Sequence, residues 1–371
     1  MPSLAPTVKL NDGRSMPAFG LGTWQATPEQ VGEAVKHAID VGYRHIDTAA
    51  AYCNESGVGD ALQEKFKEGA VKREDVFVTS KLLNTCHSPE LVVPACKKTL
   101  TDLKLDYVDL YLVHRPFSNR EGDDFYFLEN GTAVNTDIDY MDTWKQMEEC
   151  VNLGLAKSIG VSNFNSKQLS RLIEAATIKP VINQIECHPY LNQKKLIHFC
   201  KEMDIIVTAY CPLANPSMIM PGGEVPTLDN PKLKLLAAKY KKTVAQVILR
   251  YVFQLGAVPI PKPFNKKSIE QNIQIFDFKI ISNDITYINT LNKNYRIFPF
   301  TELADCHKAR ACREEESSPD VILTKQKLLN ITLLMMNSEA PQKMYLNRKN
   351  SAKKLQSATD FFNVILLLTF L

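Results

Sequence analysis

Three short stretches decide the fold of this chain: GYRHID (residues 42–47), DVFVTSK (75–81) and DYVDLYLVH (106–114). Each is rich in β-branched and aromatic residues, which is typical of a β-strand. Each also ends in a side chain that can carry charge, respectively Asp47, Lys81 and His114. Aspartate is poorly tolerated inside a strand and costly to bury unpaired, so Asp47 needs a partner.

The same pattern continues outward along the chain. Further strand-like runs are PAFGLGTW (17–24), AKSIGVSN (156–163), PVINQIE (180–186), IIVTAY (205–210) and AVPIPK (257–262). Between the runs, apolar residues recur at helical spacing, as in PEQVGEAVKHAIDVG (28–42), PELVVPACKKTLTDL (89–103) and VAQVILRYVFQ (244–254). KLNDGRSM (9–16) has an Asp-Gly turn between short apolar runs and predicts a hairpin.

Eight strands that alternate with helices predict an α/β protein, a closed (β/α)8 TIM barrel with an N-terminal β-hairpin. The alternative is an open, doubly wound sheet. The chain has no G-x-G-x-x-G stretch, which disfavours the nucleotide-binding form of that sheet.

Composition narrows the class of protein. The 371 residues carry a net charge of +3 with both signs interspersed, which does not favour a nucleic-acid or membrane-surface binder. The nine cysteines are scattered without a CxxC pair, so we expect neither a zinc site nor a disulfide scaffold. The N-terminus lacks the features of a signal peptide. We therefore expect a monomeric cytoplasmic protein that acts on a small molecule, without a metal.

Two segments depart from the alternation. Residues 117–137 are polar and aromatic without a period and predict a long loop after the His114 strand. Residues 313–371 are rich in Lys, Asn and Ser, and end in the apolar run FFNVILLLTFL, which is too short to span a bilayer. We expect a barrel domain over residues 1–312 and a disordered extension over 313–371.

The polar side chains at the strand ends are expected to lie close together. The carboxyl ends of adjacent parallel strands meet at one rim, so Asp47 can pair with Lys81 there. Tyr52 follows in the next loop, where the ammonium is expected to lower the pKa of its phenol toward the working range. His114 could orient a carbonyl oxygen by donating a hydrogen bond. Such a set suits reduction of an aldehyde or ketone, with hydride from a cofactor. Each residue taken singly is more often structural than catalytic, a strand-end aspartate as a helix cap and a lone histidine as a core residue, and it is their combination that favours the catalytic interpretation.

Several longer motifs in register resemble the aldo-keto reductases. They are GLGTW (20–24), YRHIDTAAAYCNE (43–55), TSKL (79–82), DLYLVH (109–114), IGVSNF (159–164), NQIECHPY (183–190), AYCPL (209–213) and IPKPFNKKSIEQN (260–272). The resemblance covers about residues 7 to 305, and it implies a (β/α)8 barrel with NADPH-dependent carbonyl reductase activity.

The resemblance also implies roles for individual residues. Asp47, Tyr52, Lys81 and His114 match the catalytic tetrad, with Tyr52 as general acid. The positions that match cofactor contacts are Thr23, Trp24, Asp47, Ser162, Asn163, Gln184, Tyr210, Leu213, Lys262 and Asn272. Those that match the substrate pocket are Trp24, Tyr52, Leu83, His114 and Arg115.

Some positions differ from the pattern of the family. Pro263 and Ser268 replace a serine and an arginine that commonly serve the 2′-phosphate, so the expected NADPH preference is weakened. Gln25 and Ser217 replace an ionic clasp over the cofactor. Arg115 stands where many members have tryptophan, and a guanidinium there would favour a substrate with a carboxylate or several hydroxyls, unless it points to solvent.

Two other functions are compatible with these residues. The same fold could serve as a non-catalytic cofactor-binding or structural protein, although the complete tetrad favours turnover. Alternatively, Lys81 could be the Schiff-base lysine of a barrel aldolase, which borohydride trapping without cofactor would reveal.

Overall fold

The structure is a computed structural model that describes residues 4–122, 128–129, 132–214, 227–263 and 265–298. The predicted extension over 313–371 and its boundary at 312 lie outside these residues and stay predictions. Within the described part, no helix is long and apolar enough to cross a membrane.

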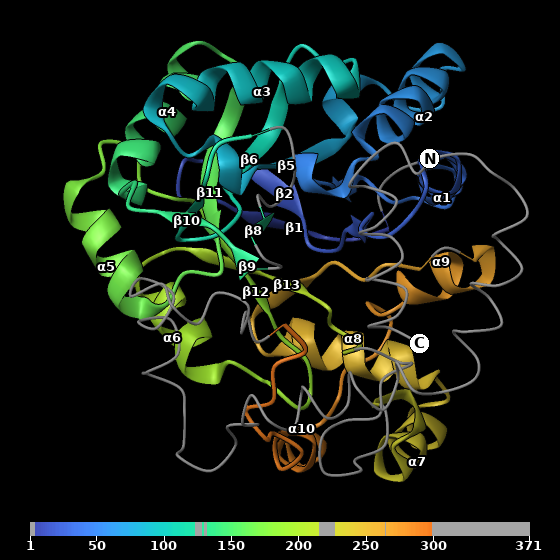
Figure 1. The fold of residues 1–371 in the computed structure, drawn as a ribbon. Coiled ribbons are helices and arrows are strands. Elements are labelled where there is room, and N and C mark those ends of the chain that lie inside the picture. The colour runs from blue at the N-terminus through green and yellow to red at the C-terminus, as the bar shows by residue number, and fades with distance from the viewer. Residues whose placement is uncertain (1–3, 123–127, 130–131, 215–226, 264, 299–371) are drawn as a thin grey trace, which may run out of the picture. The chain divides into compact units, whose positions relative to one another are not determined.

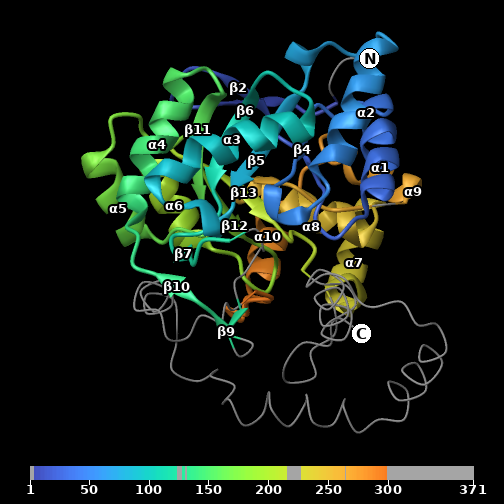
Figure 2. The same cartoon turned by 45° about the horizontal axis from the view of Figure 1, so that its top comes forward.

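Eight parallel strands form one sheet, in the order β14-β13-β12-β11-β6-β5-β4-β3 (Figure 1). The strands are β3 Leu21–Gly22, β4 His45–Asp47, β5 Phe77–Leu82, β6 Val108–Val113, β11 Ala156–Ser162, β12 Ile182–Glu186, β13 Ile206–Tyr210 and β14 Ala257–Pro259. Helices surround the strands in both views (Figures 1 and 2). They are α1 Pro28–Asp40, α2 Glu55–Lys67, α3 Pro89–Leu103, α4 Tyr140–Asn152, α5 Ser166–Ala175, α6 Lys194–Glu202, α7 Pro231–Tyr240, α8 Val244–Gln254, α9 Lys266–Asn272 and α10 Ser282–Asn289. The predicted (β/α)8 barrel is confirmed.

The barrel closes through a seam between the segments of β3 and β14. The backbone N–H groups of Gly20 and Gly22 donate to the carbonyls of Pro259 (3.1 Å) and Pro261 (2.9 Å). In a parallel pair, the return bond comes from the residue two positions beyond each acceptor. Those residues are Pro261 and Pro263, which have no N–H to donate. The seam is therefore bonded in one direction only, and both edge strands are shorter than the sequence predicts.

The predicted N-terminal hairpin is also confirmed. Strand β1 (Thr7–Lys9) pairs antiparallel with β2 (Ser15–Pro17), and Val8 lies opposite Met16. Gly13 occupies the turn with a φ of +88°, a conformation that glycine adopts at little cost. Asp12 accepts a hydrogen bond from the backbone N–H of Arg14 at 3.0 Å and fixes the turn.

The long segment after β6 is not entirely irregular. Two small antiparallel ladders occur in it: β7 (Ser118–Asn119) with β10 (Asn135–Thr136), and β8 (Leu128–Glu129) with β9 (Thr132–Ala133). Runs of two residues are too short to show an alternating pattern in the sequence, so the prediction of a plain loop missed them.

Alternation along the strands decides which side chains point into the barrel. On β6, Leu110 and Leu112 join a buried cluster with residues such as Val258, whereas Tyr111 and Val113 pack in the larger cluster with the helices. Continuing the two-residue period past Leu112 directs His114 inward, at the carboxyl end of its strand. Asp47 on β4 and Lys81 on β5 also point into the barrel. Lys81 lies opposite Leu112, and Asp47 lies opposite Thr79, which in turn lies opposite Leu110. The sequence thus brings three ionisable side chains to one rim of the barrel.

Candidate active site

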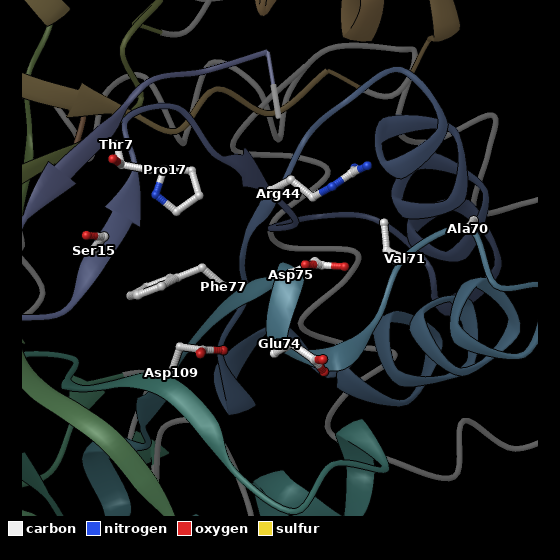
Figure 3. A pocket seen from close by; sticks show the side chains of 10 residues that line it. All are labelled: Thr7, Ser15, Pro17, Arg44, Ala70, Val71, Glu74, Asp75, Phe77 and Asp109. Carbon is white, nitrogen blue, oxygen red and sulfur yellow. The ribbon is translucent and has the colours of Figure 1, made fainter. Parts of the chain in front are cut away.

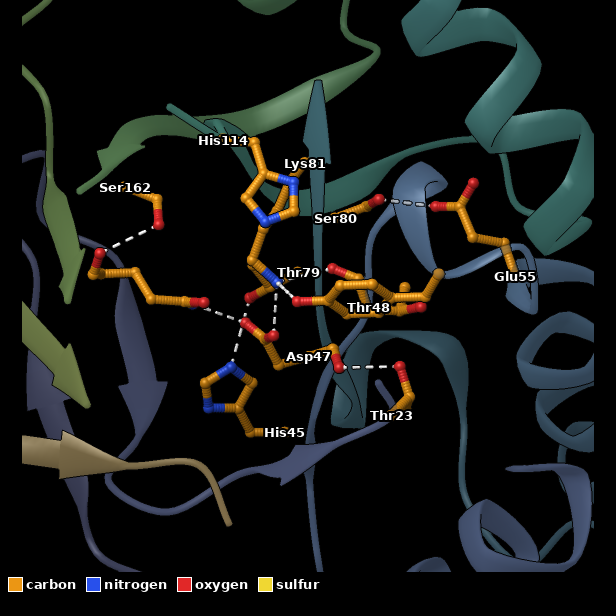
Figure 4. Close-up of polar contacts among 12 residues, drawn as sticks. Thr23, His45, Asp47, Thr48, Glu55, Thr79, Ser80, Lys81, His114 and Ser162 are labelled. Carbon is orange, nitrogen blue, oxygen red and sulfur yellow. Dashed lines mark hydrogen bonds and ion pairs between the residues drawn. The ribbon is translucent and has the colours of Figure 1, made fainter. Parts of the chain in front are cut away.

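Lys81 is the hub of the polar cluster at this rim (Figure 4). Its side chain is completely buried. The ammonium Nζ donates to Asp47 Oδ1 at 2.5 Å, to the Thr48 carbonyl at 2.8 Å and to the Tyr52 hydroxyl at 3.2 Å. An ammonium has three N–H donors, so all of them have a partner.

The Asp47 carboxylate has a hydrogen-bonding partner for each of its two oxygens. Besides Lys81, its Oδ2 accepts a hydrogen bond from Gln184 Nε2 at 2.7 Å. Its backbone carbonyl accepts from Thr23 Oγ1 at 3.1 Å. Both carboxylate oxygens are thus paired, which offsets the cost of burying the charge.

The environment keeps Lys81 charged. Burial alone would lower the pKa of its ammonium, but the carboxylate of Asp47 and then the phenol of Tyr52 outweigh burial, and the net shift raises that pKa. A permanently charged group therefore lies within hydrogen-bonding distance of the Tyr52 oxygen.

Tyr52 ends the short 3-10 helix η1 (Ala50–Tyr52), and the chain reverses at Cys53 with a φ of +54°. The loop is anchored by Asn54, whose Nδ2 donates to the carbonyls of Thr23 (2.8 Å) and Ala26 (3.0 Å). This anchoring turns the phenol back toward Lys81.

The expected lowering of the Tyr52 pKa is wrong as a net direction. Burial raises the pKa of this phenol, and the ammonium of Lys81 lowers it by a smaller amount, so the net shift is upward. The sequence indicated the neighbouring charge but not that packing would leave the ring half-buried. The phenol is consequently protonated at neutral pH, and Lys81 reduces the cost of its ionisation.

His114 completes the cluster as a neutral imidazole. Its ring meets that of Tyr52 edge to face, with centroids 6.0 Å apart. The pKa of His114 lies well below its usual range because of burial, with a further contribution from the positive charges of Lys81 and Arg115. A neutral imidazole still has one N–H to donate.

A second polar group lies at the ends of β11, β12 and β13. Ser162 Oγ donates to the Gln184 carbonyl at 2.9 Å. Asn163 has a φ of +65°, and its Nδ2 donates to the His114 carbonyl at 3.0 Å. Tyr210 donates its hydroxyl to Asn163 Oδ1 at 2.8 Å. Gln184 joins this group to the Lys81 cluster by hydrogen bonds, because its carbonyl accepts from Ser162 and its amide donates to Asp47.

Trp24 and Lys262, which follow β3 and β14 respectively, contact each other. Lys262 Nζ lies 5.2 Å from the centre of the Trp24 ring and donates to Gln25 Oε1 at 2.9 Å. Burial lowers the pKa of the Lys262 ammonium, because removal from water disfavours the charged form. Gln25, which replaces one member of the expected ionic clasp, thus accepts a hydrogen bond from the Lys262 ammonium.

The remaining predicted positions are more peripheral. Arg115 and Leu83 are half-buried beyond the ends of β6 and β5, Leu213 follows β13, and Asn272 is buried at the end of α9. Ser217 lies outside the described residues.

Sequence reasoning missed a wall of the site that comes from the end of the described chain. The ring of Phe298 meets Trp24 at 5.2 Å and Tyr210 at 6.1 Å between centroids. Its backbone N–H donates to Glu186 Oε2 at 3.0 Å, and the N–H of Ile297 donates to Glu186 Oε1 at 2.6 Å. Glu186 lies within the NQIECHPY motif, where His188 Nε2 contacts its Oε1 at 2.8 Å, but nothing in that motif indicates that the carboxylate also binds the backbone of residues 297 and 298.

A cleft of about 530 Å³ lies elsewhere, among residues near the amino ends of β4, β5 and β6 (Figure 3). Its lining includes Arg44, Asp75 and Asp109. Barrel enzymes place their chemistry at the carboxyl ends of the strands, so this cleft is not the candidate active site. The described residues also contain no group of three or more His, Cys, Asp or Glu side chains that could hold a metal ion.

Comparisons with known proteins agree with this geometry. The family model described as the Aldo/keto reductase family matches residues 17–293. The chain is 50% identical over 292 residues to aldo-keto reductase family 1 member A1 of Gallus gallus, covering 78% of this chain and 89% of that protein. It is 46% identical over 303 residues to prostaglandin F synthase 1 of Bos taurus, covering 79% and 93%.

Solved structures give the same result. The crystal structure of a Bombyx mori aldo-keto reductase in complex with NADP matches with a TM-score of 0.75 and 42% identity, covering 81% of this chain and 97% of that one. The aldose reductase of Schistosoma japonicum matches with a TM-score of 0.77 and 41% identity, covering 82% and 98%.

Proposed function

The chain belongs to the aldo/keto reductase family and reduces aldehydes or ketones with NADPH, and we propose that Tyr52 gives the proton to the carbonyl oxygen. The observation that carries the role of Tyr52 is the 3.2 Å contact between its hydroxyl and the buried ammonium of Lys81. A non-catalytic role is not favoured, because relatives are named reductase, synthase and dehydrogenase.

The residues at the rim fit a nicotinamide cofactor. Gln184 uses its amide N–H to hold Asp47, which leaves its amide oxygen to accept a hydrogen bond. Ser162 and Asn163 add a hydroxyl and a second amide beside it, and Tyr210 adds an aromatic face. The buried Thr48 hydroxyl has no partner among the described residues, so the rim retains hydrogen-bonding capacity for a bound molecule. Bound here, NADPH supplies the hydride for the carbonyl carbon.

Four side chains then carry the proton chemistry. The neutral ring of His114 donates a hydrogen bond that orients the carbonyl oxygen. Tyr52 transfers its phenolic proton to that oxygen as negative charge develops on it. The ammonium of Lys81 stabilises the phenolate that this leaves, and Asp47 keeps the ammonium charged and in place.

A tyrosine-to-phenylalanine exchange tests this assignment. Tyr52→Phe is expected to lower kcat by more than tenfold with NADPH and a small aldehyde, because the proton donor is lost. NADPH binding, measured by fluorescence titration, should change little, since the ring is kept. Tyr107→Phe is the matched control, because Tyr107 precedes β6 at the opposite end of the barrel. A Tyr52→Phe enzyme that retains more than a tenth of the wild-type kcat would show that another acid does the work.

For the substrate we propose an aldehyde or ketone that also carries a negative charge. The support comes from Arg115, whose positive charge lowers the pKa of His114 and opposes the upward shift at Tyr210, so it acts on both sides of the site. One desolvated charge contact is worth roughly 1.5–3 kcal/mol, or about 10- to 150-fold in affinity.

Two matched substrates test that preference. We expect higher kcat/KM with 4-carboxybenzaldehyde than with 4-methylbenzaldehyde. Arg115→Leu should remove the difference, whereas Arg120→Leu, an exposed arginine on the same loop, should preserve it. If Arg115→Leu still preferred 4-carboxybenzaldehyde to the same extent, the guanidinium would not be the group that recognises the carboxylate of the substrate.

We also propose that the protein acts as a monomer in the cytoplasm. The seven cysteines among the described residues are all free thiols, which fits a reducing compartment. Light scattering after size-exclusion chromatography should give a mass near 41.8 kDa. A mass of twice that value would reject the monomer.

A further inference from the structure

Buried polar atoms without a partner concentrate in one corner of the barrel, behind His114. Among the described residues, twelve buried side-chain atoms have no hydrogen-bond partner. Five of them belong to residues that follow β5 or β6: Thr85 Oγ1, His87 Nδ1, His87 Nε2, His114 Nδ1 and Asn119 Oδ1. A buried polar atom that nothing satisfies is destabilising, so we expect a hydrogen-bonding occupant here.

His87 is the most exceptional of these residues. Its side chain is 1% exposed, and neither ring nitrogen has a partner among the described residues. Its backbone, in contrast, is fixed, because its carbonyl accepts a hydrogen bond from Thr143 Oγ1 at 2.9 Å. A buried imidazole with a fixed backbone and two unused nitrogens is not explained by packing alone.

The chain path brings His87 close to His114. Strand register pairs Leu82 with Val113, so β5 and β6 end side by side. His87 follows directly after the 3-10 helix η3 (Asn84–Cys86), which packs against β7. Asn84 Nδ2 donates to the Phe117 carbonyl at 3.5 Å, which ties that turn to the segment after His114.

Both rings are neutral at physiological pH. Burial lowers the pKa of His87 to about 3. The pKa of His114 is lowered by burial and then by the charges of Lys81 and Arg115, and a smaller contribution comes from His87. Each ring therefore offers one N–H donor and one bare nitrogen acceptor.

We propose that His87 is a positioning residue for the reaction: an ordered water bridges its ring to His114 Nδ1 and fixes the His114 tautomer with its proton on Nε2. The water donates to the bare Nδ1 and accepts from the N–H of His87. Buried waters typically make about three hydrogen bonds to otherwise unsatisfied groups, and the corner supplies enough of them. Nε2–H is then left to meet the substrate, so this inference rests on the proposed role of His114 in orienting the carbonyl.

The tautomer can be read directly by NMR of full-length protein labelled with ¹⁵N-histidine. A His114→Gln sample identifies the His114 signals among those of the seven histidines. In the wild type we expect a protonated Nε2 and a bare Nδ1. In His87→Leu we expect a mixture of tautomers or the opposite one, because Nδ1 loses its donor. We also expect kcat/KM to fall by about 10- to 100-fold, less than the roughly 100- to 1,000-fold lost when such a donor is removed outright.

Two controls separate positioning from structural damage. Thr143→Val removes the hydrogen bond to the His87 backbone and leaves the ring in place, so the tautomer should be unchanged. His87→Gln keeps a donor and an acceptor and should restore most of the activity lost in His87→Leu. If His87→Leu does not fold, the wild-type spectrum decides, because a His114 protonated on Nδ1 would overturn the proposal.

An unchanged tautomer in folded His87→Leu, with kcat/KM within twofold of wild type, would also overturn it. The failure of the proposed function looks different. In that case His114→Gln would keep full activity while the spectra still linked the tautomer of His114 to His87.

Discussion

Replacing Lys81 by methionine tests the electrostatic core of the site. Methionine has a similar length but no charge, so Lys81→Met removes the ammonium that lies 3.2 Å from the Tyr52 oxygen. At that distance, with an effective dielectric constant of about 20, a full charge on the phenol oxygen gains about 5 kcal/mol from the ammonium. Half a charge in the transition state gains about 2.6 kcal/mol. These free energies correspond to losses in kcat of about 80- to 6,000-fold.

The assay follows NADPH absorbance at 340 nm with saturating aldehyde between pH 6 and pH 10. The alkaline limb that reports ionisation of Tyr52 should move to higher pH, since Lys81 lowers the pKa of that phenol against the larger effect of burial. Lys262→Met is the matched control, because Lys262 contacts Gln25 and Trp24 and should affect cofactor affinity instead. A Lys81→Met enzyme with kcat within tenfold of wild type would refute the reasoning.

Stability must be separated from catalysis in this experiment. Lys81→Met leaves the buried Asp47 carboxylate with the hydrogen bond from Gln184 but without its cation, and breaking a buried ion pair typically costs about 3–5 kcal/mol. The double variant Asp47→Asn/Lys81→Met removes both charges. It should recover most of the lost stability in urea unfolding yet remain as slow as Lys81→Met, because the ammonium is still missing.

Three further predictions concern other parts of the chain. Lys262→Ala should weaken NADPH by about 10- to 150-fold and NADH much less, because the ammonium would contact the 2′-phosphate; equal losses in fluorescence titration would exclude that role. Burial raises the pKa of Glu55 to about 7, against 4.5 for the free group, so the free energy of unfolding should fall by about 3 kcal/mol as pH rises from 4.5 to 7. Glu55→Gln should flatten that pH profile in chemical denaturation, and an unchanged slope would assign it to other groups. Truncation after Arg313 should keep kcat/KM for a small aldehyde within about threefold, roughly 0.65 kcal/mol, whereas a tenfold loss or a failure to fold would make the extension part of the enzyme.

The parts of the fold that follow from periodicity could be predicted from the sequence. The predicted helices at 89–103 and 244–254 match α3 and α8 residue for residue, because both keep one apolar face, α3 begins at a proline and α8 begins after the capping residue Thr243. The contact between Asp47 and Lys81 was also predictable, since both residues end adjacent strands. The limits of β3 and β14 were not, because the proline residues that remove the return bonds act on a partner strand far away in the sequence.

The residues of the site could be predicted from the sequence, but their burial, their pKa values and their long-range contacts could not. The pKa of Tyr52 depends on burial, which the final packing decides, and the sequence gives only its charged neighbour. Phe298 reaches the site because its neighbour Ile297 binds Glu186 from 111 positions along the chain. The two ring nitrogens of His87 likewise have no partner among the described residues because of how the fold packs around them, and no local motif carries that information.

The one-way seam of the barrel has a consequence for how cofactor and protein stabilise each other. Trp24 follows the donor side of the seam, at Gly20 and Gly22, and Lys262 follows the acceptor side at Pro261. A dinucleotide that contacts residues on both sides would therefore stabilise the pairing of β3 with β14 across the seam. By linkage, a ligand at 100 times its Kd adds about 2.7 kcal/mol to the free energy of unfolding. In amide hydrogen exchange, the Gly20 and Gly22 protons should therefore be among the first of the barrel to exchange in the free protein and among those most protected by NADPH.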